Sequence, residues 1–394
     1  MKMRPWRVFA AACIVVVGFC AIAAIFYLSL YKTNVTERDF VEYWAGEQQL
    51  VHGANPYDAD AIFQIERAVG LKRNQPEVSF SPPVALFLAL PLGYVGASIG
   101  LVIWSLLLFI CLSLSLWILW LLQGRPPTLV HLAGFLFAPA LVCIQAGQIG
   151  IFLLFGVVLF LYFRESWPLL AGAALLPCVL KPHLFLPCAI ALLLWAFSRG
   201  AYRILAGFFI SLLGSSLLTL HFDPHVWSDY ARMMRTSGAL DHYVPTLSAS
   251  LRYLVAPHAV WVQFIPELGA CCWSIWYFWT RRHQWNWMTE GMLLLLVSEL
   301  CTPYAWFTDE SVLLPTVFVG VFRAFELRRS LVPIALVAGV ALIEAYSVVQ
   351  IKSVGYLWTA PAWLAWYLYA TRGKRANTKE LEVAASEPAG TQRA

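Results

Sequence analysis

Long apolar segments alternate with short polar ones along the chain, from Val8 almost to Tyr369. A transmembrane helix needs about 20 apolar residues, and shorter runs suit re-entrant or interfacial helices. The pattern predicts an all-α polytopic membrane protein with about 12 transmembrane helices, within a range of about 10 to 13. The candidate spans are 8–30, 82–96, 98–121, 129–143, 149–163, 168–196, 203–220, 259–279, 288–301, 310–325, 331–349 and 354–370.

The composition excludes an ordinary soluble domain. Hydrophobic residues make up 60% of the chain and charged residues 12%, and the mean hydropathy is +0.69. Soluble domains are about 25% charged, and they do not leave this much apolar surface in water. Many Trp and Tyr residues, including Trp104, Trp167 and Trp358, lie near the ends of apolar runs, as in the aromatic belts of membrane proteins.

The short basic segments predict the orientation. Lys and Arg accumulate on the cytoplasmic side, so Lys2, Arg4 and Arg7 place the N-terminus there, followed by an uncleaved first span. An even number of crossings then puts every basic loop inside, along with both termini. These loops contain Arg199, Arg203, Arg281, Arg282, Arg323, Arg328, Arg329, Arg372, Lys374 and Arg375.

This orientation divides the chain into one membrane domain and a tail. The membrane domain covers 1–370 and carries two long outer loops, about 31–81 and 221–258. The polar segment 371–394 has few aromatic residues, so we expect a disordered cytoplasmic tail.

Charge and cysteine content exclude several classes of partner. The net charge of +5 forms no basic face, so binding to nucleic acid is not expected. The nine cysteines lie in or beside apolar runs without a C-x-x-C pair, which indicates neither a zinc site nor a disulfide framework. No cofactor is predicted, although carboxylates of the outer loops could hold a divalent metal weakly.

Asp39 is the first candidate for chemistry. Residues 39–50 have helical spacing, with Gly53 beyond the end, and predict a short amphipathic helix on the membrane surface. Asp39 either caps this helix or presents a carboxylate at the mouth of the membrane bundle, where a general base is useful.

Lys181 is the second candidate, because it lies deep inside an apolar run. A charge at mid-membrane costs about 2.5–3.5 kcal/mol, and Pro182 stops a regular helix there. With His183 it indicates an anion site, such as one for a phosphate. The alternative is a lysine paired with a structural carboxylate such as Glu299 or Glu344.

Two other polar segments interrupt apolar runs. Gln148, flanked by glycines, forms either a turn or a polar group entering a cavity. Asp309 and Glu310 begin a later helix, where carboxylates suit the helix dipole and can cap, while Tyr304 and Trp306 could line an acceptor site.

Six segments in order resemble glycosyltransferase family 87, the polyprenyl-phosphate-sugar-dependent transferases, many of them bacterial mannosyltransferases, built on the GT-C fold. The resemblance covers about 35–325. The segments are RDFVEYW with LVHGANPYD, FSPPVALFLALPL, GQIGIFLLF, LLAGAALLPCVLKPHLFL, PTLSASLRYLV and TPYAWFTDESVLLP. The chain departs from the family at Trp306, where members often carry His. It also departs at Gly150, where many have Asn, and at Pro245-Thr246, where many have Asn-Gln.

The resemblance implies a hexosyltransferase of the bacterial inner membrane. It would move a hexose, expected to be mannose, from a polyprenyl phosphate to an extracytoplasmic lipid or glycan hydroxyl, with inversion. Asp39 would be the catalytic carboxylate. The expected substrate-binding residues are Lys181, His183, Gln148, Glu42, Tyr57, Tyr304 and Asp309. The alternative is a transporter or lipid flippase for a glycan or lipid, although no internal symmetry is visible.

Overall fold

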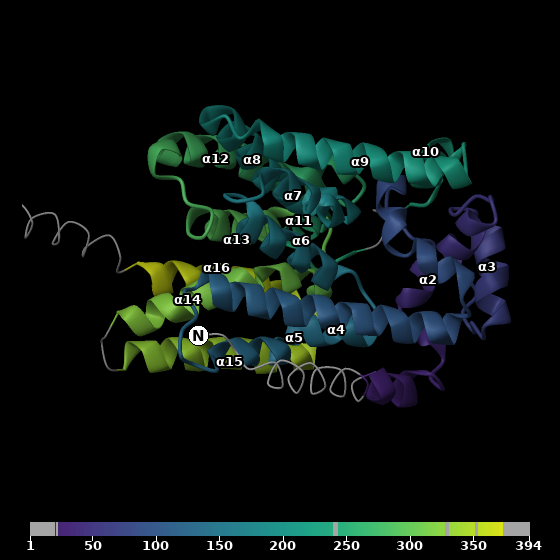
Figure 1. The fold of residues 1–394 in the computed structure, drawn as a ribbon, viewed down its shortest axis with the longest axis horizontal. Coiled ribbons are helices and arrows are strands. Elements are labelled where there is room, and N and C mark those ends of the chain that lie inside the picture. The colour runs from purple at the N-terminus through teal and green to yellow at the C-terminus, as the bar shows by residue number, and fades with distance from the viewer. Residues whose placement is uncertain (1–19, 21–22, 239–242, 328–330, 351–353, 373–394) are drawn as a thin grey trace, which may run out of the picture. The chain divides into compact units, whose positions relative to one another are not determined.

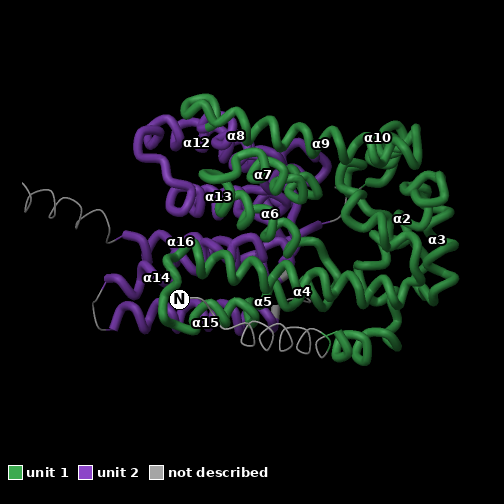
Figure 2. Tube along the Cα trace, in the orientation of Figure 1, with its two compact units in different colours: residues 1–182, 196–242 green, residues 183–195, 243–394 purple. Residues whose placement is uncertain are grey.

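The computed structural model describes residues 20, 23–238, 243–327, 331–350 and 354–372. These residues form α-helices and short 3-10 helices, joined by turns, and no strand occurs among them (Figure 1). The all-helical prediction is therefore confirmed for this part of the chain. The chain divides into two compact units (Figure 2), residues 1–182 with 196–242 and residues 183–195 with 243–394.

The first unit contains the polar loop 31–81 and the three longer helices α4, α6 and α9. Its elements are η1 (Val35–Glu37), α2 (Phe40–Val51), α3 (Ala59–Ala68), η2 (Pro83–Leu88), η3 (Leu90–Tyr94), α4 (Ala97–Leu122), η4 (Val130–Leu136), α5 (Ala138–Ala146), α6 (Gly150–Phe163), α7 (Pro168–Ala173), η5 (Leu176–Leu180), α9 (Tyr202–Phe222) and α10 (Val226–Thr236). Helix α4 packs against α6, and α7 packs against both α6 and α9.

The second unit begins with most of η6 (Pro182–Phe185) and α8 (Leu186–Arg199). Its other elements are α11 (Leu247–Val255), η7 (Val260–Phe264), α12 (Ile265–Arg281), η8 (Arg282–Gln284), α13 (Glu290–Cys301), η9 (Phe307–Leu313), α14 (Leu314–Glu326), α15 (Val332–Gln350), η10 (Val354–Trp358) and α16 (Thr359–Thr371). Helix α16 packs against α13, α14 and α15.

Four described helices are long and apolar enough to cross a membrane, namely Ala97–Leu122, Pro182–Arg199, Tyr202–Phe222 and Val332–Val349. Two shorter apolar helices of the described residues, Gly150–Phe163 and Pro168–Leu180, fall within the predicted spans 149–163 and 168–196. The count of about 12 crossings stays a prediction. Most of the expected first span, residues 328–330 and the tail from 373 lie outside the described residues.

The predicted span 168–196 is broken into short pieces, as Pro182 indicated. Helices α7, η5, η6 and α8 follow one another here, and Pro177, Pro182 and Pro187 each lie within the first residues of a helix or at a break. Lys181 itself is non-helical, with φ −135° and ψ 73°. The Lys181 side chain is therefore attached at an interruption of the helical backbone. At such interruptions, side chains can reach a polar interior.

Hydrogen bonds fix helix α2 against residues 93–95, which follow loop 31–81 in the chain. The Trp44 indole N–H donates to the Val95 carbonyl oxygen at 2.9 Å, and the Gln48 amide donates to the Gly93 carbonyl oxygen at 2.7 Å. A Cβ on Gly93 would lie 2.5 Å from the Glu47 carbonyl oxygen, so only glycine permits this approach. The predicted helix over 39–50 is confirmed.

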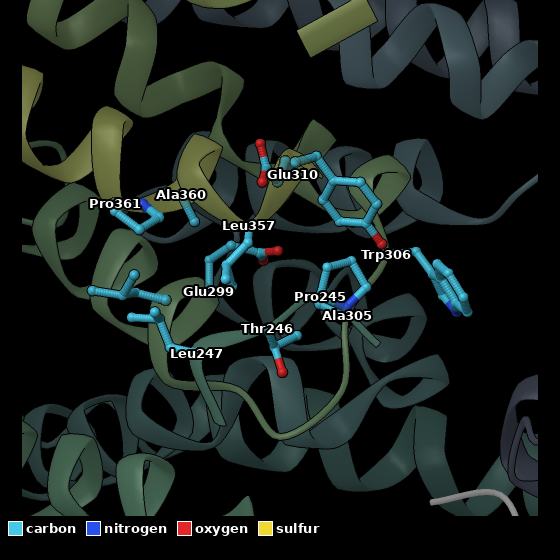
Figure 3. A pocket seen from close by; sticks show the side chains of 12 residues that line it. Pro245, Thr246, Leu247, Glu299, Ala305, Trp306, Glu310, Leu357, Ala360 and Pro361 are labelled. Carbon is cyan, nitrogen blue, oxygen red and sulfur yellow. The ribbon is translucent and has the colours of Figure 1, made fainter. Parts of the chain in front are cut away.

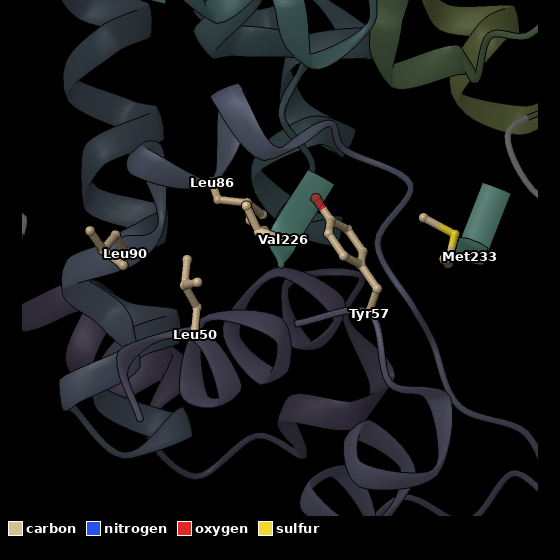
Figure 4. Close-up of a cluster of buried hydrophobic side chains, with 6 residues drawn as sticks. All are labelled: Leu50, Tyr57, Leu86, Leu90, Val226 and Met233. Carbon is tan, nitrogen blue, oxygen red and sulfur yellow. The ribbon is translucent and has the colours of Figure 1, made fainter. Parts of the chain in front are cut away.

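A cluster of buried side chains also packs against helix α2 (Figure 4). It joins α2 to η2, η3 and α10 through Leu50, Tyr57, Leu86, Leu90, Val226 and Met233. The helix that begins at Asp39 is thus held by apolar packing as well as by hydrogen bonds.

Candidate active site

Asp39 lies immediately before α2, and its side chain makes no capping hydrogen bond. Its carboxylate oxygen Oδ2 instead accepts a hydrogen bond of 2.9 Å from the side-chain amide of Gln148. The capping alternative is therefore wrong for this arrangement, because the carboxylate faces another segment of the same unit.

Gln148 reaches Asp39 because Gly147 ends α5 in a left-handed turn, with φ 76°. The backbone N–H groups of both residues donate to the Cys143 carbonyl oxygen, at 3.0 Å and 2.9 Å. A Cβ on Gly147 would lie 2.7 Å from the Cβ of Phe40, so the close approach depends on glycine. The segment is a turn, as one alternative predicted, and it presents a buried amide. A cavity beside Gln148, the other alternative, stays a prediction.

Trp104 of α4 contacts both the turn at Gly147 and helix α2. It is fully buried, and its indole N–H donates to the Gly147 carbonyl oxygen at 2.7 Å. Its ring stacks on Tyr43 with centroids 5.6 Å apart and meets Phe152 edge-on at 4.8 Å. Such aromatic packing restricts rotamers, so Trp104 limits the movement of the turn relative to α2.

Tyr43 and Glu42 extend the hydrogen-bonded group. They follow Asp39 by four and three positions, which places all three side chains on one face of the helix. The Tyr43 hydroxyl donates to the Gln148 carbonyl oxygen Oε1 at 3.0 Å, and the side chains of Tyr43 and Glu42 are hydrogen-bonded. A continuous chain therefore runs from Glu42 through Tyr43 and Gln148 to Asp39.

The environment of Glu42 keeps it protonated at neutral pH. Burial and the neighbouring charge of Asp39 raise the pKa of Glu42 to about 8, while the hydrogen bond with Tyr43 and the positive charge of Lys181 oppose the increase. A protonated carboxyl adds little negative charge beside Asp39 and can donate a hydrogen bond.

Lys181 is buried, with 9% of its surface exposed, and its charge acts on Glu42. The structure thus brings the sequence-predicted residues Asp39, Glu42 and Gln148 together, and Lys181 lies near enough for its charge to act on Glu42. Glu299 and Glu344, the alternative partners of the lysine, belong to the second unit, so that pairing stays a hypothesis.

His183, Tyr304 and Trp306 form a separate aromatic group in the second unit. The His183 and Tyr304 rings meet edge-on at 6.0 Å, and the Trp306 indole N–H donates to the Tyr304 hydroxyl at 2.7 Å. Trp306 also lines a cavity of about 20 Å³ with Thr246, Glu310 and other residues (Figure 3). That volume suffices for about one water molecule, and an acceptor would need more room.

The remaining two predicted residues have structural partners. Asp309 is fully buried, and its carboxylate accepts the backbone N–H of Trp306 at 2.8 Å, which is the capping alternative. Tyr57 donates to the Ser81 carbonyl oxygen at 2.8 Å inside the buried cluster. A substrate role for either residue stays a prediction.

Tyr43 and Trp104 were missed as site residues. The spacing of Tyr43 from Asp39 offered a signal, whereas nothing local connects Trp104 to the turn at Gly147. Among the described residues, no group of three or more His, Cys, Asp or Glu side chains is arranged to hold a metal ion.

Comparison with known families decides the class of protein. The profile of glycosyltransferase family 87 matches residues 81–303, more than half of the chain. The chain belongs to glycosyltransferase family 87. No curated protein and no solved structure matches it.

Membership in glycosyltransferase family 87 favours a transferase over the transporter alternative. The matched range contains Gln148, Lys181 and His183, and it begins after Asp39 and ends before Tyr304. The assignment of a role to Asp39 therefore depends on the geometry around it.

Proposed function

We propose that the protein transfers a hexose, mannose in the first instance, from a polyprenyl phosphate to a hydroxyl group outside the cytoplasm. The observation that supports this best is the uncapped carboxylate of Asp39, held by Gln148 in the group that Lys181 also approaches. A carboxylate and a cation in one unit are the pair that such a transfer needs.

In the proposed reaction, Asp39 removes the proton of the acceptor hydroxyl. The acceptor oxygen forms a bond to C1 of the sugar while the bond from C1 to the phosphate oxygen breaks, so the anomeric configuration inverts. The proton ends on Asp39, and the polyprenyl phosphate leaves with the bonding electron pair.

Lys181 would stabilise the leaving phosphate, where negative charge increases in the transition state. Its position at a helix break gives its ammonium group access to a polar interior. A substrate role for His183 and Tyr304, which belong to the second unit, stays a prediction. This scheme uses Asp39 as the base and Lys181 at the phosphate, and it includes no metal ion.

Glu42, Tyr43 and Gln148 would position the base. The Gln148 amide donates to one oxygen, Oδ2 of Asp39, which leaves the other oxygen to receive the proton. Tyr43 in turn fixes the orientation of the amide, because it donates to Oε1.

The direct test supplies the purified full chain with polyprenyl-phosphate [14C]mannose and a membrane extract as acceptor. We expect labelled product with inverted anomeric configuration, and no product from a nucleotide-linked mannose. Transfer from the nucleotide sugar alone would refute the lipid-linked donor, and transfer of another hexose from polyprenyl phosphate would correct only the sugar.

A further inference from the structure

The second unit contains a large cavity, lined mostly by residues with polar groups, that the proposed reaction does not use. Its volume is about 770 Å³, which is within the range of about 300–1,000 Å³ typical of small-molecule sites. Its walls come from α12, η8, α13, α14 and α16 and the segments that join them. The lining residues are Tyr277, Arg281, Gln284, Asn286, Thr289, Glu290, Leu293, Val319, Arg323, Tyr367, Leu368, Thr371 and Arg372.

The lining carries an excess of positive charge. Three arginines, Arg281, Arg323 and Arg372, face one glutamate, Glu290. Several side chains without charge, including Gln284 and Asn286, add hydrogen-bond donors. A cavity with this combination favours an anion with several oxygen atoms.

A carboxylate of the lining neutralises Arg281, whereas Arg323 and Arg372 form no ion pair with another lining residue. Arg281 pairs with Glu290 at 3.2 Å, and the Tyr277 hydroxyl also donates to Glu290. Arg323 pairs at 2.5 Å with Glu326, whose side chain is 64% exposed and lies outside the lining. Among the ion pairs of the described residues, none involves the exposed Arg372.

The orientation expected from the sequence places these arginines on the cytoplasmic side. Basic pockets between membrane helices on that side bind the phosphate headgroups of lipids. The opposite side is where the proposed transfer takes place, so this cavity is separate from Asp39 in role.

We propose that this cavity binds a phosphate group through Arg323 and Arg372, with Arg281 oriented by Glu290 at its wall. The phosphate comes either from an anionic membrane lipid or from free phosphate, and both share the same recognition by guanidinium groups. The proposal does not depend on the transfer reaction.

Thermal unfolding of the full-length protein in an uncharged detergent tests it. Phosphatidylglycerol should raise the Tm by about 3 °C or more, since a ligand that binds only the folded state stabilises it. Phosphatidylcholine should have no effect. If inorganic phosphate also raises the Tm, the ligand is free phosphate; if only phosphatidylglycerol does, it is the lipid headgroup.

Variants assign the effect to the cavity. Arg323→Gln/Arg372→Gln should weaken apparent binding of the effective probe about tenfold or more, because each substitution removes a charged donor. Arg372→Gln alone, at an exposed side chain, should weaken it without a cost to folding. Arg203→Gln, an exposed arginine of α9 outside the cavity, is the control and should bind normally.

Three results would overturn the proposal. One is the absence of a Tm increase with either phosphatidylglycerol or phosphate. Another is an increase that persists in both Arg372 variants. The third is an equal loss in Arg203→Gln, which would indicate a diffuse attraction between basic residues and anionic lipid.

Discussion

The side-chain amide of Gln148 donates a hydrogen bond of 2.9 Å to the carboxylate of Asp39, which lies 109 positions earlier in the chain. This contact joins loop 31–81 to the turn between α5 and α6. It gives the carboxylate a fixed orientation that a helix cap would not explain.

Gln148→Ala should reduce the transfer rate about 10- to 100-fold, the range expected when a hydrogen bond to a charged group is lost. The Asp39 carboxylate would then be free to rotate away from the acceptor. Gln145→Ala is a matched control, because it removes an exposed amide three positions earlier in α5. Steady-state rates of both purified variants decide the matter, and equal rates would show that Gln148 does not orient the base.

Gly147→Ala should lower both the Tm and the transfer rate. The substitution strains a residue at φ 76° and adds a Cβ that would lie 2.7 Å from the Cβ of Phe40, so we expect a cost of more than about 1 kcal/mol. Gly124→Ala is the control, since φ is 80° and no atom lies within 4 Å of the added Cβ. It should lower the Tm slightly and leave the specific activity of the folded fraction unchanged. Identical behaviour of the two variants would contradict the close approach.

Glu42 should limit activity at high pH. Its pKa of about 8 means that the carboxyl loses its proton above that pH. The ionised group would take the Tyr43 hydrogen bond away from Gln148 and place a second negative charge beside Asp39. The wild-type rate should therefore fall as the pH rises through about 8, and Glu42→Gln should remove that decline.

The same pKa predicts how stability depends on pH. The folded-state pKa of Glu42 lies above its ordinary value of 4.5, so the folded protein holds a proton that the unfolded chain releases between the two values. Stability should fall as the pH rises through that window, and Glu42→Gln should weaken the dependence. Measurements of the Tm at about pH 5 and about pH 9, near the edges of that window, check this. If the Tm of Glu42→Gln changes with pH as much as that of the wild type, Glu42 is not the source of the dependence.

Much of this region could be predicted from the sequence because its signals are local. The apolar spacing and Gly53 predicted α2, and Pro182 predicted the break beside Lys181. The position of Asp39, Glu42 and Tyr43 on one helix face also follows from spacing alone.

The contact with Gln148 could not be predicted, because nothing local indicates which turn lies beside Asp39. It depends on the close approach of Gly147 to Phe40 and on Trp104 of α4, which packs against both residues. The predicted span 82–96 shows a second limit. Hydropathy indicates an apolar segment there, but Pro83 and Pro91 accompany two short 3-10 helices rather than one α-helix.

Lys181→Ala should raise the donor KM or reduce kcat at least about tenfold, because the leaving phosphate loses its counter-charge. Lys181→Arg should retain part of the activity, since it keeps the charge but changes the geometry. Expression should not suffer, because removing a buried charge relieves a cost. Lys72→Ala, at an exposed lysine of the outer loop, is the control. Unchanged donor kinetics in Lys181→Ala would assign this lysine a structural role.

The central claim is that Asp39 is the general base, and transfer by the purified Asp39→Asn variant tests it most directly. The amide cannot accept the proton, so the rate should fall about a hundredfold to ten-thousandfold, while the Tm and the binding of polyprenyl-phosphate sugar stay close to wild type. Asp39→Ala should be equally inactive. An Asp39→Asn protein that transfers sugar at the wild-type rate would contradict the account.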